Sequence, residues 1–492
     1  MAGVESRPNS RIYNVFPHPP AVNDVKPSFR CGVLVRRGAS NGVQPVAAQQ
    51  KSNTAGWLWS QSIGQKEYYE EIKCSPLPSF LKIEFHKRHW QTLRSSNGTY
   101  HIYGAYLDTR GNQRVNDIQD KSKSASYVRI ITVLNRFQPN FTIFCQLRFA
   151  EQEKPRIVRT RPYLYIWRDF WDYRRSGPWQ PYLITCVLPP AVRGLVPASV
   201  SLVERPCDRA TNNLSVYYDM PLHGHRHEFA VCVKELDFLK KDISVRLVEW
   251  IELVRLLGAH KIFFYKLQVH RNIFMVLKYY EYLGFVSVIP TTRPADTGPK
   301  HKPVQLITYN DCLYRNMYQY RWLALLDIDE VIIPLKDRDW SSLMRRVSSK
   351  TTGKSAYFTS NLYFLDSLRV NHSFEQAVPR YMHMLQHVYR THNFSLHGSY
   401  SKAFHETDRV LTLHNHFPIH CLGQCSCYPI PTNVARLQHY RAECSPTGNQ
   451  TCKDLTKHTE RDKTLWRWRD PLVLRTGVAL RSLSLIPHNK TA

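Results

Sequence analysis

The spacing of apolar residues along this chain changes near residue 225. Upstream of that point, short apolar segments alternate with turn residues, at 80–85, 100–107, 127–134, 141–149 and 182–187. Such segments, rich in β-branched and aromatic residues, are typical of strands in an antiparallel sheet. We therefore expect a small β-rich domain over residues 61–225, which closes at the turn-rich stretch 221–225.

Downstream of residue 228, short apolar runs alternate with longer amphipathic stretches. The short runs predict buried strands at 229–233, 261–265, 285–290 and 322–326. The longer stretches predict helices at 243–257, 272–283 and 304–320. Asp242 is a suitable N-cap for the first helix, and Gly258 and Gly284 end the first and second. Strands and helices that alternate in this way are typical of a parallel α/β sheet.

Three carboxylates directly follow the apolar run 322–326, namely Asp327, Asp329 and Glu330. They fall at the C-terminal end of a parallel strand, the edge where open α/β sheets bind ligands. Strand alternation would point Asp327 and Asp329 the same way and Glu330 the other way. Two neighbouring carboxylates repel unless one is protonated or a cation such as Mn²⁺ or Mg²⁺ bridges them. Asp-x-Asp therefore predicts a metal site for a nucleoside diphosphate, and the alternative is a solvated strand end.

The rest of the chain completes the expected domain organisation. Residues 1–60 are rich in Pro, Ser, Gly and Asn without periodicity, which predicts a mobile N-terminal segment. We expect the catalytic domain over residues 226–465 and a C-terminal tail over residues 466–492. The α/β half contains neither a Gly-rich dinucleotide fingerprint nor a P-loop. A nucleotide held there needs another means of neutralising its phosphates.

The formal net charge of +28 is large for 492 residues. Such a charge suits nucleic acid, an anionic membrane surface or an anionic substrate. The Lys and Arg residues are scattered, and their densest clusters, 156–161 and 467–469, match no nucleic-acid-binding pattern. We therefore expect no nucleic-acid partner.

Cysteines and glycosylation sequons favour an oxidising lumen over the cytosol. The chain has 12 cysteines, and its seven Asn-x-Ser/Thr sequons begin at Asn97, Asn140, Asn213, Asn371, Asn393, Asn449 and Asn489. Residues 1–30 contain no apolar signal segment. Either the protein is not lumenal or, as we expect, an N-terminal anchor is missing from this sequence. The stretch 414–427 contains His and Cys that could bind zinc, but its spacings fit no standard finger, which favours disulfides.

Several blocks of sequence resemble glycosyltransferase family 92. They are Asn-Asp-Cys-Leu-Tyr-Arg at 310–315, the Asp-x-Asp stretch at 322–330, Leu-Val-Glu-Trp-Ile-Glu-Leu at 247–253, Ala-Arg-Leu-Gln-His-Tyr-Arg at 435–441 and Ala-Tyr-Leu-Asp-Thr-Arg at 105–110. The resemblance implies a GT-A-like mixed sheet with a Rossmann-like parallel half, preceded by the β-rich domain. It also implies a metal-dependent transferase of the Golgi lumen, anchored to the membrane. Its donor would be a UDP-sugar, first of all UDP-galactose, and its acceptor a glycan or glycoprotein.

The resemblance also assigns roles to single residues. His439 would complete the Mn²⁺ (or Mg²⁺) shell begun by Asp327 and Asp329, and Arg441 would face the diphosphate. Asp311 is a candidate donor contact. The alternatives are that His439 is a core or surface histidine, that Arg441 forms a surface ion pair, and that Asp311 is a carboxylate on a helix surface. For Glu330 a structural role and a role supporting the metal ligands are equally open.

An inverting transfer needs a base for the acceptor hydroxyl. Asp366 and Glu406 follow the metal motif, where acceptor contacts are expected, and the sequence does not choose between them.

Two other functions fit the same residues. A metal-dependent phosphoryl or nucleotidyl transferase would use the same acids, although the chain has no P-loop or kinase motif set. A non-catalytic glycan- or polyanion-binding protein on the same fold is the second alternative. Intact Asp327 and Asp329 argue against it.

Overall fold

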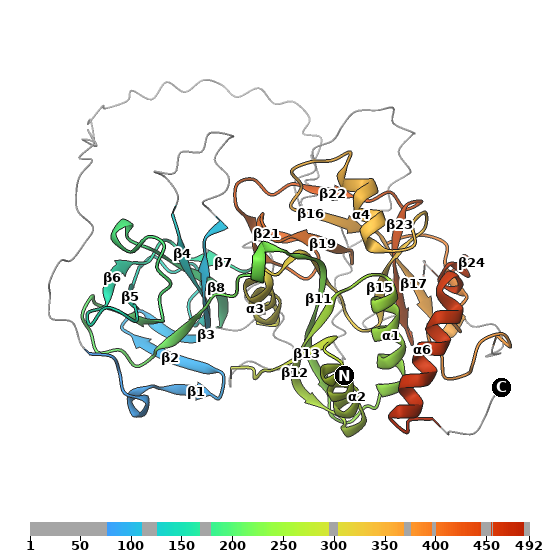
Figure 1. Cartoon of the computed structure of the whole chain (residues 1–492), viewed down its shortest axis with the longest axis horizontal. Coiled ribbons are helices and arrows are strands. Elements are labelled where there is room, and N and C mark those ends of the chain that lie inside the picture. The colour runs from blue at the N-terminus through green and yellow to red at the C-terminus, as the bar shows by residue number, and fades with distance from the viewer. Residues whose placement is uncertain are drawn as a thin grey trace, which may run out of the picture.

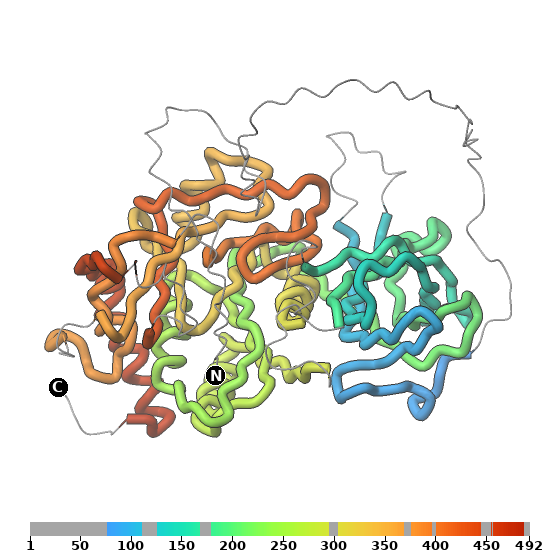
Figure 2. Tube along the Cα trace, turned by 180° about the vertical axis from the view of Figure 1, so that it is seen from behind, coloured from blue at the N-terminus to red at the C-terminus, as the bar shows by residue number. Residues whose placement is uncertain are grey.

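The computed structural model describes residues 76–110, 125–167, 179–294, 304–368, 375–395, 400–443, 454 and 456–486. A β-rich domain and a larger α/β half lie side by side in both views of the chain (Figures 1 and 2). The expected mobile segment, residues 1–60, lies outside the described residues. The α/β half starts with strand β11 (His227–Phe238), next to the boundary expected at residue 225.

The β-rich domain is one curled antiparallel sheet with a single parallel pair. Its strands are β1 (Phe85–Lys87), β2 (Trp90–Ser95), β3 (Gly98–Asp108), β4 (Tyr127–Leu134), β5 (Phe144–Arg148), β6 (Arg156–Arg159), β7 (Leu164–Tyr165), β8 (Gln180–Val187), β9 (Ser199–Val203) and β10 (Leu214–Tyr217). They run in the order β6-β5-β9-β10-β3-β4-β8-β7, with β2 beside β3 and β1 beside β2. A bridge from Thr160 to Cys186 links the end of β6 to β8, so the sheet closes around its own apolar core.

Four parallel strands begin the sheet of the α/β half. β12 (Lys261–Val269), β13 (Val286–Pro290) and β14 (Tyr320–Leu325) join β11 in the order β13-β12-β11-β14. The strand order reverses between β11 and β14. In open α/β sheets, ligands bind beside the carboxyl ends of the strands at such a point.

The same sheet continues with antiparallel strands, which makes it mixed. β19 (Lys402–Glu406) pairs antiparallel with β14, and β16 (Ala356–Thr359) pairs antiparallel with β19. β22 (Cys427–Pro429) completes the seven strands. A parallel half extended by antiparallel strands is the GT-A-like architecture expected from the sequence.

Helices cover both faces of this sheet. α1 (Ser244–Leu256), α2 (Arg271–Tyr282), α4 (Trp340–Ser348) and α6 (Arg469–Ser482) contribute to the apolar cluster on one face. α3 (Leu306–Asn316) covers the other face and packs against the β-rich domain on its outer side. Gly258 and Gly284 lie two residues after the last residues of α1 and α2, with φ angles of 101° and 74° that favour glycine.

The last helix corrects the expectation of a C-terminal tail over residues 466–492. α6 packs along α1 and buries Leu472, Ala479 and Leu480 in the main core (Figure 1). These residues recur at helical spacing, and the two tryptophans upstream dock by donating indole N–H bonds to main-chain carbonyls. The described part of this segment is therefore a structural element of the α/β half.

Three smaller sheets complete the half. The first consists of β15 (Glu330–Pro334), β23 (Ala435–Arg441) and β17 (Asn361–Leu365), with β23 in the centre. β18 (Tyr389–Thr391) pairs with β24 (Thr459–Arg461), and β20 (Val410–Leu413) pairs with β21 (Pro418–Cys421). Of these sheets, only the first carries a residue that the sequence placed in the metal site, His439 on β23.

Disulfide bonds tie several of these elements together. Cys145–Cys186 crosses the β-rich domain, Cys232–Cys312 joins β11 to α3, and Cys421–Cys425 closes a loop after β21. Cys207 and Cys427 are also disulfide-bonded. Because Cys421, Cys425 and Cys427 are all oxidised, disulfides rather than zinc account for this part of the stretch 414–427.

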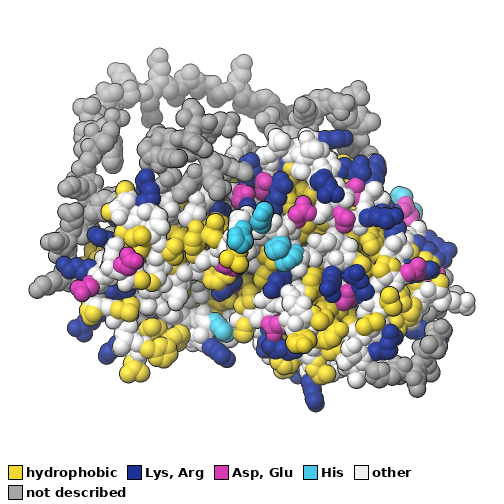
Figure 3. All heavy atoms as spheres, in the orientation of Figure 1, with side chains coloured by type: hydrophobic (Ala, Val, Ile, Leu, Met, Phe, Trp, Pro, Cys, Tyr) yellow, Lys and Arg dark blue, Asp and Glu magenta, His cyan; other side chains and the backbone are white. Residues whose placement is uncertain are grey.

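The surface carries its positive charge in many places. In Figure 3, Lys and Arg side chains are dispersed over the visible face and interleaved with acidic and apolar side chains. Among the described residues, no helix has the length and apolar character needed to cross a membrane.

Candidate active site

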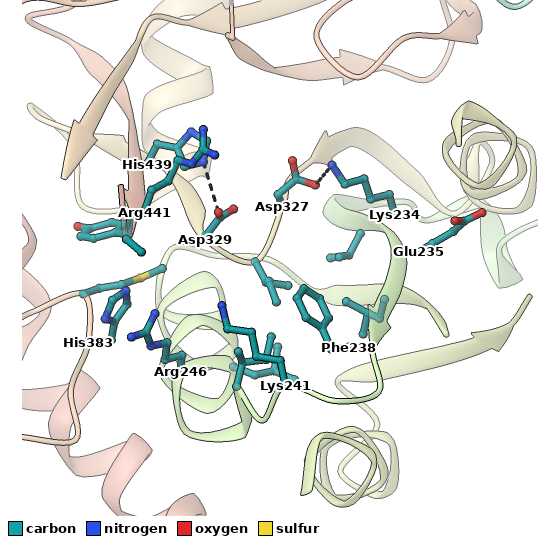
Figure 4. A pocket seen from close by; sticks show the side chains of 18 of the residues that line it. Lys234, Glu235, Phe238, Lys241, Arg246, Asp327, Asp329, His383, His439 and Arg441 are labelled. Carbon is teal, nitrogen blue, oxygen red and sulfur yellow. Dashed lines mark ion pairs between the residues drawn. The ribbon is translucent and has the colours of Figure 1, made fainter. Parts of the chain in front are cut away.

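A cavity of about 540 Å³ opens beside the carboxyl ends of β11 and β14. Its lining comes from the end of β11, the start of α1, the turn after β14, the loop around His383 and the end of β23 (Figure 4). These segments lie far apart in the sequence and meet where the order of the parallel strands reverses. Asp327, Asp329, His439 and Arg441, four of the seven residues proposed from the sequence, line this cavity.

The Asp-x-Asp motif lies in a turn, which corrects the expectation that it continues a strand. β14 ends at Leu325, and residues 326–329 connect it to β15, which starts at Glu330. The main-chain N–H of Asp327 donates to Oε1 of Glu330 at 2.9 Å, and that of Glu330 donates to the carbonyl of Asp327 at 3.2 Å. Because these residues form a turn and not a pleated strand, the side chains of Asp327 and Asp329 do not point the same way and have different neighbours.

Asp329 faces His439 across the cavity mouth (Figure 4). The Oδ2 atom of Asp329 lies 3.4 Å from Nε2 of His439, and 45% of the Asp329 side chain is exposed. The register of β15 and β23 creates this proximity, because Glu330 pairs with His439 and the N–H of Tyr440 donates to the carbonyl of Asp329.

Asp327 instead contacts two lysines. Its Oδ1 lies 2.9 Å from Nζ of Lys234, in the C-terminal half of β11, and its Oδ2 lies 3.2 Å from Nζ of Lys402, on β19. Burial alone would raise the pKa of Asp327, but the two ammonium groups outweigh it and hold that pKa well below its usual range. Asp327 is therefore a carboxylate that already has cationic partners.

Glu330 supports the turn from beneath. It is buried, and its Oε1 lies 2.5 Å from Nζ of Lys402, which is itself only 1% exposed. Burial raises the pKa of Glu330, and the charge of Asp327 adds to this effect against the attraction of Lys402. The other oxygen, Oε2, lies 3.7 Å from Nδ1 of His439, so Glu330 combines a structural role with a position behind a candidate ligand.

The helix that carries the Leu-Val-Glu-Trp stretch fixes two walls of the cavity. The indole N–H of Trp250 donates to the carbonyl of Glu330 at 2.9 Å. The carboxylate of Glu249 accepts the main-chain N–H groups of His383, Met384 and Leu385. Desolvation raises the pKa of Glu249 to about 7, against the lowering effect of these N–H donors. α1 therefore positions both the Asp-x-Asp turn and the opposite loop.

Three cations line the cavity besides Lys234. Lys241 precedes α1, Arg246 lies in its first turn, and Arg441 ends β23 (Figure 4). None of the three forms an ion pair with a described residue. Only Arg441 was singled out from the sequence. Lys234 and Arg246 were detectable, because they directly follow a predicted strand and a predicted helix start at the ligand-binding edge of the sheet.

Asp311 is removed from the candidate site. It is fully buried on α3 at the boundary with the β-rich domain, where the hydroxyls of Tyr106 and Tyr265 donate to its two oxygens. Nε of Arg315 lies 2.7 Å from Oδ2. This network joins the two domains and does not contact the cavity.

The two base candidates also lie outside the lining of the cavity. Glu406 pairs with Trp322 near the opposite end of β14 and forms an ion pair with Arg409 at 2.8 Å, so we remove it from the site. Asp366 follows β17, whose last residue, Leu365, pairs with Arg441. Asp366 is therefore next to the cavity but is held by His387, with 2.6 Å between Oδ1 and Nε2.

The chain was compared with known proteins. It matches the family model "Glycosyltransferase family 92" over residues 227–472, half of the chain. It is 26% identical over 171 residues to "Beta-1,4-galactosyltransferase galt-1" of Caenorhabditis elegans. That match covers 32% of this chain and 38% of the relative, so the chain spans well under half of the relative's length.

Solved structures of sugar-transferring enzymes are also similar in part. The galactosyltransferase LgtC, in complex with donor and acceptor sugar analogs, has 12% sequence identity and a TM-score of 0.23, with 53% of this chain and 98% of that chain covered. The bifunctional glycosyltransferase WbbM has 10% identity and a TM-score of 0.17, with 31% and 27% covered. TM-scores this low add nothing to the family match. The family match, which spans half of the chain and includes the Asp-x-Asp turn, shows that the chain belongs to glycosyltransferase family 92.

Proposed function

We propose that this glycosyltransferase transfers galactose from UDP-galactose to a glycan acceptor with the help of a divalent metal in the Golgi lumen. The observation that carries the proposal is the pair formed by Asp329 and His439, 3.4 Å apart at a cavity whose lining includes three cations without an ion-pair partner among the described residues. The combination suits a ligand that brings two phosphates and shares a metal with the protein.

The residues at the cavity mouth fit a divalent ion. The Asp329 carboxylate and the Nε2 atom of His439 are an oxygen and a nitrogen donor, a combination that Mn²⁺ accepts. The Nδ1 atom of His439 has no hydrogen-bond partner among the described residues and faces Glu330. A histidine that binds a metal through one nitrogen commonly presents its other N–H to a carboxylate. Asp327 stands outside this pair, because its lysine contacts already neutralise it.

The unpaired cations suit a diphosphate. Arg246 and Arg441 present planar guanidinium groups, which pair with phosphate oxygens bidentately, and Lys241 adds a third charge. The N-terminal end of α1, which favours negative charge, lies on the same side, and Asp242 caps the N–H of Ser244 there. These groups replace the P-loop that the chain lacks. A bound divalent ion would stabilise the charge that develops on the departing UDP.

The apolar part of the lining suits the uracil ring. Leu236, Phe238, Ile243 and Ile328 contribute to one side of the cavity. Pockets of this kind bury the flat part of a ligand and leave orientation to a few polar groups. Galactose as the sugar is supported by the name of the Caenorhabditis elegans relative, and the lumenal location by the disulfides and sequons.

Thermal unfolding with and without ligand tests the proposal. UDP-galactose with Mn²⁺ should raise the melting temperature, and EDTA should abolish most of the shift, because only the native state binds. UDP-glucose and ATP serve as matched ligands. The variant Arg246→Met should weaken the shift, whereas Arg475→Met, on α6 and away from the cavity, should not.

Other outcomes would redirect the proposal. An equal shift in EDTA would mean that protein cations hold the diphosphate without a metal. A response to ATP but not to UDP-sugars would favour phosphoryl or nucleotidyl transfer. Binding of glycans or heparin without release of UDP from any donor would favour a non-catalytic binding protein.

A further inference from the structure

A second group of side chains with metal-ligand atoms lies at the loop that forms one wall of the cavity. It consists of Asp366, His383 and His387, and their ligand atoms all lie within 4.8 Å of one another. His383 reaches the cavity lining, but Asp366 and His387 do not. The three residues are separate from Asp329 and His439, which the proposed donor site uses.

The hydrogen bonds of His387 fix where its lone pair points. Nδ1 lies 2.6 Å from the main-chain carbonyl of His383, which only accepts hydrogen bonds, so Nδ1 carries a proton. Nε2 lies 2.6 Å from Oδ1 of Asp366. In the neutral imidazole this places a lone pair of Nε2 against a carboxylate oxygen. The contact is favourable only with a cation between the two atoms, either a proton or a metal ion.

Three observations favour a metal ion at this position. The Nδ1–H bond to a main-chain carbonyl is the contact that commonly orients a metal-binding histidine. The rings of His383 and His387 lie beside each other, with centroids 4.5 Å apart, so a third ligand is already present. Glu249 holds the main chain at His383, Met384 and Leu385, so the loop that carries both histidines is anchored before any ion binds.

The geometry also indicates which ion. Two imidazoles and one carboxylate are the ligand set of open zinc sites, with bonds of about 2.0–2.1 Å and ligand atoms about 3.4 Å apart. Asp366 would need to withdraw from His387 by roughly 1 Å. It follows a strand end and its side chain is 36% exposed, whereas His387 is 1% exposed and remains fixed.

We propose that Asp366, His383 and His387 form a second divalent-metal site, which binds Zn²⁺. Its fourth coordination position would stay open and face the cavity, on the side where His383 reaches the lining. The site does not depend on the proposed donor or on Mn²⁺. It would clamp the end of β17 to the loop that Glu249 anchors.

Metal titration in a background without the first site tests this proposal. The full chain carrying Asp329→Asn and His439→Ala is freed of metal with EDTA, dialysed, and titrated with Zn²⁺ by calorimetry. We expect one equivalent to bind with micromolar or tighter affinity. Co²⁺ in place of Zn²⁺ should give the visible absorption of a four-coordinate, nitrogen-ligated ion. No donor is present, so the result is independent of the proposed activity.

Ligand variants in the same background complete the test. His387→Gln should weaken Zn²⁺ binding at least tenfold, whereas His458→Gln, at an exposed histidine, should leave it unchanged. Should His387→Gln fail to fold, Asp366→Asn replaces it, since that side chain is partly exposed. Absent Zn²⁺ binding, or binding that survives the replacement of these ligands, would show that Asp366 and His387 share only a proton, and would overturn the proposal.

Discussion

Glu330 and His439 are direct partners across the antiparallel strands β15 and β23, and this register places the imidazole of His439 beside Asp329. The pairing makes the candidate metal ligands a product of sheet geometry rather than of local sequence. It also means that Asp329 and His439 should behave as one unit in function.

Replacing Asp329 by Asn removes the charge and keeps the shape. We expect kcat/KM to fall by about 100-fold or more, as for other lost electrostatic stabilisers, with little change in melting temperature because the side chain is half exposed. Combining it with His439→Ala should add much less than the separate effects predict. The matched control is Asp454→Asn, with a similarly exposed carboxylate beside Lys457. Near-normal turnover of Asp329→Asn would contradict the proposed metal site, and additive losses would separate His439 from it.

Replacing Lys402 by Met tests the buried ion cluster beneath the turn. Lys402 contacts both Asp327 and Glu330, and its removal leaves the buried Glu330 and the partly buried Asp327 without this partner. We expect the free energy of unfolding in urea to fall by about 3–5 kcal/mol.

Two further variants separate charge from packing at this cluster. Adding Glu330→Gln to Lys402→Met should restore part of the loss, since one uncompensated charge is gone. Lys457→Met, at a 65% exposed lysine, should change stability little. Equal effects of the two lysine substitutions would show that the buried cluster has no special role.

His405 should make the fold sensitive to acid. It is fully buried on β19 and neither ring nitrogen has a hydrogen-bond partner among the described residues. Burial, with repulsion from Lys402, lowers the pKa of His405 to about 3. Below the ordinary pKa of about 6.5 only the unfolded chain binds this proton, so stability is lost as the pH falls from about 6.5 toward 3.

The variant His405→Leu isolates this effect. Between pH 7 and pH 5, the free energy of unfolding of the unmodified protein should fall by about 2 kcal/mol more than that of His405→Leu. His458→Leu, at an exposed histidine, should leave the pH dependence unchanged. Parallel curves for the unmodified protein and His405→Leu would contradict this assignment.

The sequons should be used unequally if the chain passes through the secretory pathway. Asn97, Asn140 and Asn393 are exposed, whereas Asn213 is half-buried and its Oδ1 accepts a hydrogen bond from Ser201. In protein secreted behind an added signal peptide, mass spectrometry of glycopeptides should find glycans at the three exposed sites and little at Asn213. Unmodified exposed sites in a folded, secreted protein would argue against the lumenal location.

Much of the α/β half was predictable because each strand and helix has a recognisable local pattern of apolar residues and terminating glycines. The runs 229–233 and 261–265 and the glycines at 258 and 284 mark elements whose ends depend on neighbouring residues alone. The turn at Asp327 was not predictable from alternation, since it depends on Glu330 folding back to the main chain of Asp327. Lys402 gave no local signal, because only the pairing of β14 with β19 brings it under the turn.

The chemical type of a residue was misleading where the folded structure gives a carboxylate a structural role. Asp311 and Glu406 are carboxylates in or after the motif region, but one is enclosed by tyrosines and the other belongs to the far end of the sheet. The resemblance proposes His439 as a metal ligand together with Asp327 and Asp329, and the structure brings its imidazole within 3.4 Å of Asp329 through the register of β15 and β23.

The contact between α3 and the β-rich domain bears on how the enzyme can be divided. The family match begins at residue 227, yet the carboxylate of Asp311 receives one of its hydrogen bonds from Tyr106, on a strand of the preceding domain. The outer face of α3 packs against the same domain, and its Tyr314 stacks on Tyr106 with ring centroids 5.3 Å apart. Cutting the chain at the family boundary would expose this apolar face and leave a buried acid short of a donor. We therefore expect that the smallest portion of the chain that folds on its own includes the β-rich domain, whose contact surface keeps the outer face of α3 out of water.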